Sequence, residues 1–536
     1  MTERVLVVGW DGADWTVVEH LIERGCLPNL EALIREGARA DLRSTLPTNS
    51  WAAWSTFMTG VEPGRHGVYD FVERNPAQPG RRVPVSSLSI RSPTLFQRLS
   101  DAGHEVRVGN VPVTFPPSPV KGRMISGVAI PPGREFVYPP EWAEQLKQRA
   151  PFPVNGMEWT RFRTDPERLT AEAKRLVEER SDSFEALLEG DWDVGVCVYV
   201  TPDRLQHPFG AYVLPSHPRH AALVDSPLGD AIRGVYRSLD HQLGRLRSLA
   251  GSDSHVFLLS DHGFRPVTRA ANLERILVRL GFTSPARAGQ VTRAARRLPA
   301  VRRLAKTYVG RMIKGRARRP ASVRWDRTSV YQSGSAGQLS INLKGREPHG
   351  VVEPRDYRSV CQEVREALLS YRDPETGTQP VGEVHLGSEL PEGPWASLAP
   401  DLIVAPADLW TFAHTTALTE ALDWPTGSHR ITGVFVAAGP DVSSGWAGEQ
   451  SIVDIAPTIL ALFGLETAEM DGAPITQILG RRQLEPPDQS DEGHAPLATT
   501  GAADDGGGAT SSTTPPLTDK EQESITRHLQ DLGYLE

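Results

Sequence analysis

A chain of 536 residues in which 39% are hydrophobic and 23% are charged has the composition of a folded globular protein, which excludes a globally disordered chain. The formal net charge of −8 argues against a general nucleic-acid binder, because such a protein needs a basic surface to neutralise backbone phosphates. The length exceeds the size at which a single core stops growing, so one large domain with insertions, or two domains, is expected.

The cysteines and the N-terminus indicate the cellular compartment. Cys26, Cys197 and Cys361 are widely spaced and odd in number, which matches neither a disulfide framework nor a cysteine-based zinc site. The apolar run at residues 5–8 is too short for a secretory signal, and no uninterrupted apolar stretch reaches transmembrane length. We therefore expect a cytoplasmic protein.

Short apolar runs rich in β-branched residues alternate with amphipathic stretches along the chain. The amphipathic stretches predict helices at residues 17–34, broken around Gly25 and Pro28, and at 169–189 and 228–249. The apolar runs predict strands at residues 5–8, 106–108, 194–200, 256–259, 402–404 and 434–437. This alternation predicts an α/β fold with a mostly parallel central sheet and helices on both faces.

The expected domain organisation is a catalytic body at residues 1–482 followed by a linker and a helix. Pro-rich loops interrupt the alternation at about 75–165 and 286–400, which suits inserted cap regions. Residues 483–516 are rich in Ser, Thr, Gly, Asp and Pro and predict a flexible linker. Residues 517–536 predict a C-terminal helix that docks on the body through Ile525, Leu529 and Leu532.

Two segments place potential metal ligands directly after predicted strands. Asp11 follows the first strand, where open α/β sheets gather ligand groups, although an Asp before Gly is also a common turn former. Asp261 and His262 follow the strand at 256–259 and can reach one cation from a turn that Gly263 tightens. The alternative for this second segment is a turn with an N-capping Asp.

Two further segments complete the set of potential ligands. Asp203 and His207 are four residues apart, so a helix beginning near Pro202 places both on one face; a capping Asp and a surface His are the alternative. His429 is expected on a glycine-containing loop before the strand at 434–437, where a lone His is usually solvated. Together the segments suggest a first ligand set of Asp11, Asp261 and His262, and a second ligand set of Asp203, His207 and His429.

Residues 46–67 read Leu-Pro-Thr-Asn-Ser-Trp-Ala-Ala-Trp-Ser-Thr-Phe-Met-Thr-Gly-Val-Glu-Pro-Gly-Arg-His-Gly. This segment resembles the nucleophile region of the alkaline phosphatase superfamily, close to type I phosphodiesterases and nucleotide pyrophosphatases, whose pattern is Pro-x-x-Thr/Ser followed by Thr-Gly-x-x-Pro-x-x-His-Gly. The matching residues are Pro47, Ser50, Thr59, Gly60, Pro63, His66 and Gly67. With the four ligand segments in the same order as in the family, the resemblance covers about residues 4–480 and implies an alkaline phosphatase-like fold.

The resemblance also implies a mechanism. Ser50 would attack phosphorus while bound to the cation of the first ligand set, and would become transiently phosphorylated. The cation of the second set would stabilise the leaving oxygen and then activate water. Two divalent ions are implied, with Zn²⁺ the best match to Asp and His ligands and Mn²⁺ a possible one. The expected activity is hydrolysis of a small anionic phosphate monoester or diester.

Other activities of the superfamily remain as alternatives. A phosphomutase would return the phosphoryl group to a second hydroxyl, and the ending Leu532-Gly-Tyr-Leu resembles a bacterial branch of predicted phosphohydrolases and phosphomutases. A non-catalytic metal-binding regulator is a third hypothesis, against which the intact Ser50 and ligand sets count. Phe71 stands where the nucleotide pyrophosphatases carry a phosphate-contacting Asn, which argues against nucleotide diesters unless Asn49 or a donor from an inserted region replaces it. The sulfatase motif is absent around Ser50.

The segment at 287–324 is strongly basic. It holds thirteen Lys or Arg residues and no acidic residue, with apolar residues at helical spacing at positions 298, 301, 304, 308 and 312. A basic amphipathic helix is predicted, which is compatible with a lid packed on the body, with steering of an anionic substrate, or with contact to an anionic membrane surface. Specific nucleic-acid binding ranks last.

Overall fold

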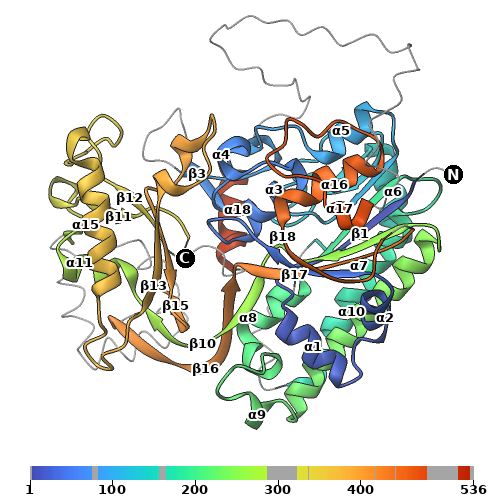
Figure 1. Cartoon of the computed structure of the whole chain (residues 1–536), viewed down its shortest axis with the longest axis horizontal. Helices are drawn as coiled ribbons and strands as arrows, with labels where there is room; N and C mark the ends of the chain where they lie inside the picture. The colour runs from blue at the N-terminus through green and yellow to red at the C-terminus, as the bar shows by residue number, and fades with distance from the viewer. Residues whose placement is uncertain are drawn as a thin grey trace, which may run out of the picture.

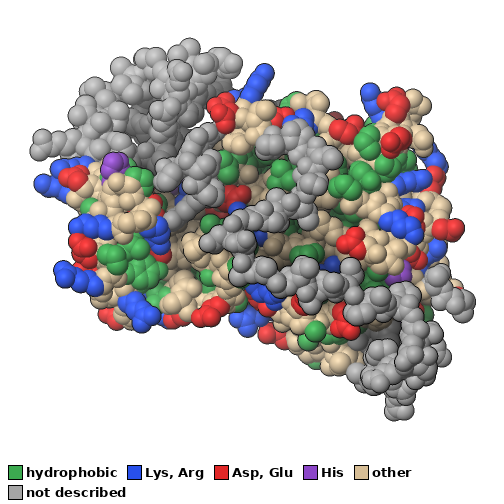
Figure 2. Space-filling view, turned by 90° about the horizontal axis from the view of Figure 1, so that it is seen from above, with side chains coloured by type: hydrophobic (Ala, Val, Ile, Leu, Met, Phe, Trp, Pro, Cys, Tyr) green, Lys and Arg blue, Asp and Glu red, His purple; other side chains and the backbone are tan. Residues whose placement is uncertain are grey.

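The computed structural model describes residues 3–74, 82–154, 156, 165–285, 323–335, 337–415, 417–440, 442–479 and 517–531. The predicted linker at 483–516 lies outside these residues, as does the basic segment at 287–324 apart from Val323 and Arg324. Figure 1 shows a large body built around a long sheet and a smaller cap beside it. In Figure 2, acidic and basic side chains are interspersed over the visible part of one face.

A nine-stranded sheet forms the centre of the body, and five of its eight strand pairings are parallel. This confirms the predicted α/β fold with a mostly parallel sheet. In spatial order the strands are β18 (Gly445–Ser451), β2 (Ala38–Arg43), β17 (Thr432–Ala438), β9 (His255–Leu259), β1 (Val5–Trp10), β8 (Val194–Tyr199), β5 (Val106–Gly109), β6 (Gly122–Ile125) and β7 (Val137–Tyr138).

Helices cover both faces of this sheet, because its central strands are buried on both sides. In β1, Leu6 and Val8 belong to one hydrophobic core and Val5 and Val7 to the other. The first core is completed mainly by α1 (Trp15–Glu23), α2 (Pro28–Glu36), α6 (Pro140–Arg149), α7 (Pro166–Leu187), α8 (Thr201–Val213) and α10 (Pro227–Ala250). The second is completed by α3 (Ser50–Thr59), α5 (Leu95–Asp101), α16 (Ile455–Leu462), α17 (Thr476–Leu479) and α18 (Asp519–Asp531).

The helices predicted at 17–34, 169–189 and 228–249 are confirmed as α1 with α2, α7 and α10. Short helices α4 (Pro63–His66) and α9 (His220–Leu223), and the hairpin of β3 (Val72–Arg74) and β4 (Arg82–Pro84), lie in the connections. Among the described residues, no helix combines the length and the apolar character needed to cross a membrane.

The cap contains two smaller sheets and a hydrophobic core of its own. The first sheet joins β15 (Leu409–Phe412), β10 (Gly263–Ala271) and β16 (Thr419–Arg430); the second joins β11 (Val330–Gln332), β12 (Gln338–Ile341), β14 (Leu402–Pro406) and β13 (Val381–Leu386). Helices α11 (Leu273–Leu280) and α15 (Tyr357–Ser370) pack on them (Figure 1). The strand predicted at 402–404 is therefore present, but as β14 in the cap and not in the central sheet.

Candidate site residues follow three adjacent parallel strands, at the carboxyl ends of these strands. β1 lies between β8 and β9, and the last residues of the three strands are in register: Trp10 is opposite Tyr199, and Gly9 is opposite Leu259. The segments that leave these strands therefore emerge side by side. Asp11, helix α8 and the Asp261-His262 bend follow directly.

The C-terminal helix α18 packs on the body through the face that its sequence makes apolar. Ile525 and Leu529 are buried in the second core, and Glu521 forms an ion pair with Arg134. Since the chain between α17 and α18 is long, this contact joins segments far apart in sequence.

We expect Leu529→Ala to lower the free energy of unfolding by about 2–5 kcal/mol, because it removes a fully buried leucine side chain from the second core. Urea denaturation of the full chain measures the difference. Glu523→Ala, an exposed position on the same helix, is the control and should change stability by less than about 0.5 kcal/mol. Equal unfolding midpoints for the two variants would contradict the contribution of α18 to the core.

Candidate metal centre and nucleophile

The turn after β1 forms the floor of the site. Asp11 is fully buried, and Gly12 adopts a φ of +70°, a conformation that disfavours other residues. A Cβ at Gly12 would lie 3.1 Å from the Cα of Asp203, so the turn packs directly against the second ligand set. The Gly12 N–H donates to Asp261 Oδ1 at 3.0 Å, which ties the turn to the first set as well.

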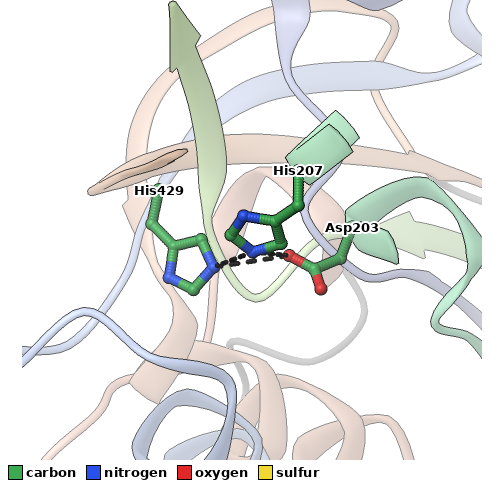
Figure 3. Close-up of side chains that lie close together, drawn as sticks. All are labelled: Asp203, His207 and His429. Carbon is green, nitrogen blue, oxygen red and sulfur yellow. Dashed lines mark hydrogen bonds and ion pairs between the residues drawn. The ribbon is translucent and has the colours of Figure 1, made fainter. Parts of the chain in front are cut away.

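The three residues of the predicted second ligand set lie close together in the structure: Asp203, His207 and His429. Asp203 and His207 are one turn apart on α8, as predicted, and His207 Nε2 lies 3.2 Å from Asp203 Oδ1. His429 Nε2 lies 3.4 Å from the same oxygen and 3.1 Å from His207 Nε2. In Figure 3 both imidazole rings turn a nitrogen towards the Asp203 carboxylate.

The expectation that His429 lies on a loop is wrong, because this residue belongs to strand β16. β16 pairs antiparallel with β10, which places His429 opposite Phe264. Gly427, the glycine that suggested a loop, instead allows the Phe264 ring to pack closely against the backbone, because a Cβ at this position would lie 2.7 Å from that ring. His429 is therefore supplied by a strand that connects the body to the cap.

The Asp261-His262 bend joins β9 to β10 and brings a third carboxylate to the site. His262 Nε2 lies 3.3 Å from Asp261 Oδ2, and His262 Nδ1 lies 3.1 Å from the Gly263 carbonyl oxygen. The His262 ring stacks on His429, with 3.8 Å between ring centroids. The two ligand sets are therefore in contact and form one cluster.

Ser50 lies at the N-terminus of α3, and its hydroxyl faces the same cluster. The Ser50 Oγ is 3.3 Å from His262 Nε2. Asn49 caps the helix by accepting a hydrogen bond from the Ala52 N–H, and its Nδ2 donates to the Tyr69 carbonyl oxygen. These two hydrogen bonds fix the start of the helix, and with it the position of the hydroxyl.

The surroundings of the three carboxylates shift their pKa values in different directions. Burial, with the charges of Asp261 and Asp203, raises the pKa of Asp11 well above its usual value. Burial also raises the pKa of Asp261, to about 7. For Asp203 the raising effect of burial is outweighed by the charges and hydrogen bonds of His207 and His429, which hold its pKa well below the usual range.

The cluster has the donors that a divalent cation requires. Two groups bring one ligand atom per residue within 4.8 Å of one another: Asp203 with His207 and His429, and Asp11 with Asp203 and His262. Asp11 Oδ1 is buried and accepts no hydrogen bond from a described residue. Buried carboxylates of like charge that lack sufficient partners favour a cation, and carboxylate oxygens with imidazole nitrogens suit Zn²⁺ or Mn²⁺.

The grouping differs in two respects from the predicted ligand sets: Asp203 belongs to both groups, and Asp261, expected in the first set, belongs to neither. Asp261 lies beside the group that contains Asp11 and His262, because its Oδ2 is 3.3 Å from His262 Nε2. Its Oδ1 accepts a hydrogen bond from the Gly12 N–H. All seven predicted site residues are nevertheless brought together: Asp11, Ser50, Asp203, His207, Asp261, His262 and His429.

A cavity of about 1900 Å³ opens beside the cluster, between the body and the cap. His207, His429 and Asn49 line it from the body side, and Trp325 and Tyr331 from the cap side. The basic side chains on its wall are Arg43, Arg82, Arg265 and Arg430.

Phe71 forms part of the cavity wall beside Trp51. Its ring packs on Trp51, with 4.6 Å between centroids, and it lines the cavity. An apolar ring therefore occupies the position at which the sequence departs from the nucleotide pyrophosphatase pattern.

Several residues that support the ligands were not identified from the sequence. Gln206 donates to the Gly12 carbonyl oxygen at 2.7 Å, and Trp54 donates to Asp11 Oδ2 at 3.0 Å. The four tryptophans near the cluster are all buried: Trp10, Trp15, Trp51 and Trp54. The spacing indicates that Trp54 lies near Ser50, because the two residues are one helical turn apart. Its acceptor, Asp11, could not be predicted because it is distant in sequence.

Comparison with known proteins places these observations in a family. A family model described as type I phosphodiesterase/nucleotide pyrophosphatase matches residues 5–431. Murine ectonucleotide pyrophosphatase/phosphodiesterase 5 has a similar fold, with 14% identity, a TM-score of 0.52, and 88% of this chain and 98% of that chain covered. An inactive form of that protein is known in complex with AMP, at 13% identity, a TM-score of 0.52, and coverage of 88% and 97%.

Phosphonoacetate hydrolase from Sinorhizobium meliloti 1021, in complex with phosphonoacetate, is also similar, with 16% identity, a TM-score of 0.53, and coverage of 86% of this chain and 95% of that chain. At such identities these structures show the fold alone. No curated protein sequence matches the chain. The family model spans most of the chain, including all seven site residues, and the chain therefore belongs to the type I phosphodiesterase/nucleotide pyrophosphatase family of the alkaline phosphatase superfamily.

Proposed function

We propose that this protein is a metal-dependent hydrolase of phosphate esters in which Ser50 is the nucleophile and two divalent cations bind the Asp and His cluster. Family membership supports phosphoester hydrolysis as the class of reaction. The observation that carries the proposal for this chain is the position of the Ser50 Oγ, 3.3 Å from His262 Nε2 and thus at the edge of a cluster with two cation-compatible groups.

Ser50 attacks phosphorus and displaces the alcohol, and water then hydrolyses the phosphorylated serine. The helix N-terminus at which Ser50 lies favours the negative charge of the phosphoryl group. Divalent cations, when bound, lower the pKa of a coordinated hydroxyl and stabilise charge on the phosphoryl and leaving oxygens. Asp203 contacts both histidines of the second set and belongs to both cation groups, so it fixes the two halves of the site relative to each other.

The cavity supports a substrate that is larger than the phosphoryl group itself. Ligand pockets usually measure about 300–1000 Å³, and this cavity of about 1900 Å³ exceeds that range. AMP and phosphonoacetate are the ligands of the structurally similar proteins, and both are small anions. Phe71 replaces the phosphate-contacting Asn, so Asn49, which lines the same cavity, is our candidate for a donor to the phosphate.

We expect Ser50→Ala to reduce turnover of para-nitrophenyl phosphate and bis-para-nitrophenyl phosphate by more than about 1000-fold, as removal of a covalent nucleophile does. Release of para-nitrophenol from the metal-reconstituted protein measures the rate, and the ratio of the two substrates ranks monoester against diester. Ser55→Ala is the matched control, because Ser55 is buried on the same helix. Turnover that survives in Ser50→Ala would contradict the role of Ser50 as nucleophile. A phosphoenzyme that forms in the wild-type protein without turnover would favour a phosphomutase.

We expect chelation to abolish turnover and lower the melting temperature, and Zn²⁺ or Mn²⁺ to restore both. A ligand at 100 times its dissociation constant stabilises the folded state by about 2.7 kcal/mol. Asp203→Asn should weaken this stabilisation more than His207→Gln, because Asp203 belongs to both groups and His207 to one. Thermal melts of each variant with and without metal test this order. Full activity of the metal-free protein would contradict metal dependence.

A further inference from the structure

Trp54 is a buried side chain whose polar group is directed at the metal centre. It lies on α3, one helical turn after Ser50, and its Nε1 donates a hydrogen bond of 3.0 Å to Asp11 Oδ2. Nucleophile and ligand are thus connected through one helix: Ser50 approaches His262 at the start of α3, and Trp54 holds Asp11 at the next turn.

Two neighbours fix the orientation of the indole ring. Gly9 in β1 leaves the space that the ring occupies, since a Cβ at Gly9 would lie 2.6 Å from Trp54 Cη2. Phe57 packs its ring against Trp54 in a T-shaped arrangement, with 5.4 Å between centroids. The ring is therefore fully buried and closely packed on two sides, which restricts its rotation and favours the hydrogen bond to Asp11.

The choice of donor matters for a carboxylate that must bind a cation. An indole N–H is neutral, so it satisfies Asp11 Oδ2 and leaves the negative charge of the carboxylate available. The other oxygen, Asp11 Oδ1, is buried and accepts no hydrogen bond from a described residue. A Lys or Arg in place of Trp54 would pair with the carboxylate and compete with the metal.

We propose that Trp54 is a positioning residue that holds Asp11 with Oδ1 directed at the cation and thereby sets the metal affinity of the centre. The inference rests on the proposed function, because it assumes that a divalent cation binds Asp11. Partners that orient a metal ligand from behind typically change metal affinity by about 10–100-fold when they are removed.

Trp54→Phe in the full-length protein tests the inference, because it keeps a ring and removes the N–H. Trp10→Phe is the matched control: Trp10 is also fully buried, and its Nε1 has no hydrogen-bond partner among the described residues. Zn²⁺ dissociation constants are measured by competition with a chromogenic chelator, and melting temperatures are measured on the metal-free proteins.

We expect the Zn²⁺ dissociation constant to rise about 10–100-fold in Trp54→Phe and to stay near the wild-type value in Trp10→Phe. A purely structural role of Trp54 would lower the metal-free melting temperature and leave the dissociation constant unchanged, which would overturn this inference alone. A wild-type protein that binds neither Zn²⁺ nor Mn²⁺ would overturn the proposed function with it.

Phe57→Leu provides a second route to the same answer if Trp54→Phe does not fold. This change removes the ring that packs against Trp54 and leaves the N–H donor in place. We expect a smaller rise in the Zn²⁺ dissociation constant, in the same direction. An unchanged constant in a variant that melts at a lower temperature would count against the positioning role.

Discussion

The burial of three carboxylates at one point is the constraint on which the rest of the site depends. Asp11, Asp203 and Asp261 are all fully buried, and each would raise the pKa of its neighbours in the absence of compensation. The protein compensates unevenly. Two histidines contact Asp203, whereas Asp11 accepts the Trp54 N–H and Asp261 the Gly12 N–H, with smaller contributions from the charges of Arg204 and His429. The positive charge beside Asp11 is therefore too small to balance the buried carboxylates. A bound cation would supply the missing positive charge.

The fold assembles this arrangement from rigid elements. Three adjacent parallel strands end together, so β1, β8 and β9 supply one carboxylate each, directly or through the segment that follows. Because the ends of packed strands move little relative to one another, ligand distances are set by the sheet and not by flexible loops. Ser50 reaches the same point from the N-terminus of the buried helix α3.

The structure brings the predicted site residues together, but it groups them differently from the sequence-based prediction. Asp203 with His207, and the candidate ligands that follow strands, could be predicted because each of these patterns spans only a few residues. His429 was assigned to a loop because Gly427 is a turn signal in sequence, whereas its tertiary role is close contact with Phe264. The sharing of Asp203 and the hydrogen bond from Trp54 depend on residues more than forty positions apart, which periodicity does not reveal.

The strand that carries His429 limits how this protein can diverge. β16 pairs with β10 over most of its length, and Arg265 on β10 donates hydrogen bonds to the carbonyl oxygens of His429, Ala407 and Trp410. The pairing is regular from Thr426 to Arg430, so insertion of a single residue there would turn His429 to the opposite face and separate it from Asp203. The end of β16 that carries His429 therefore tolerates a change in length less well than the connections within the cap do.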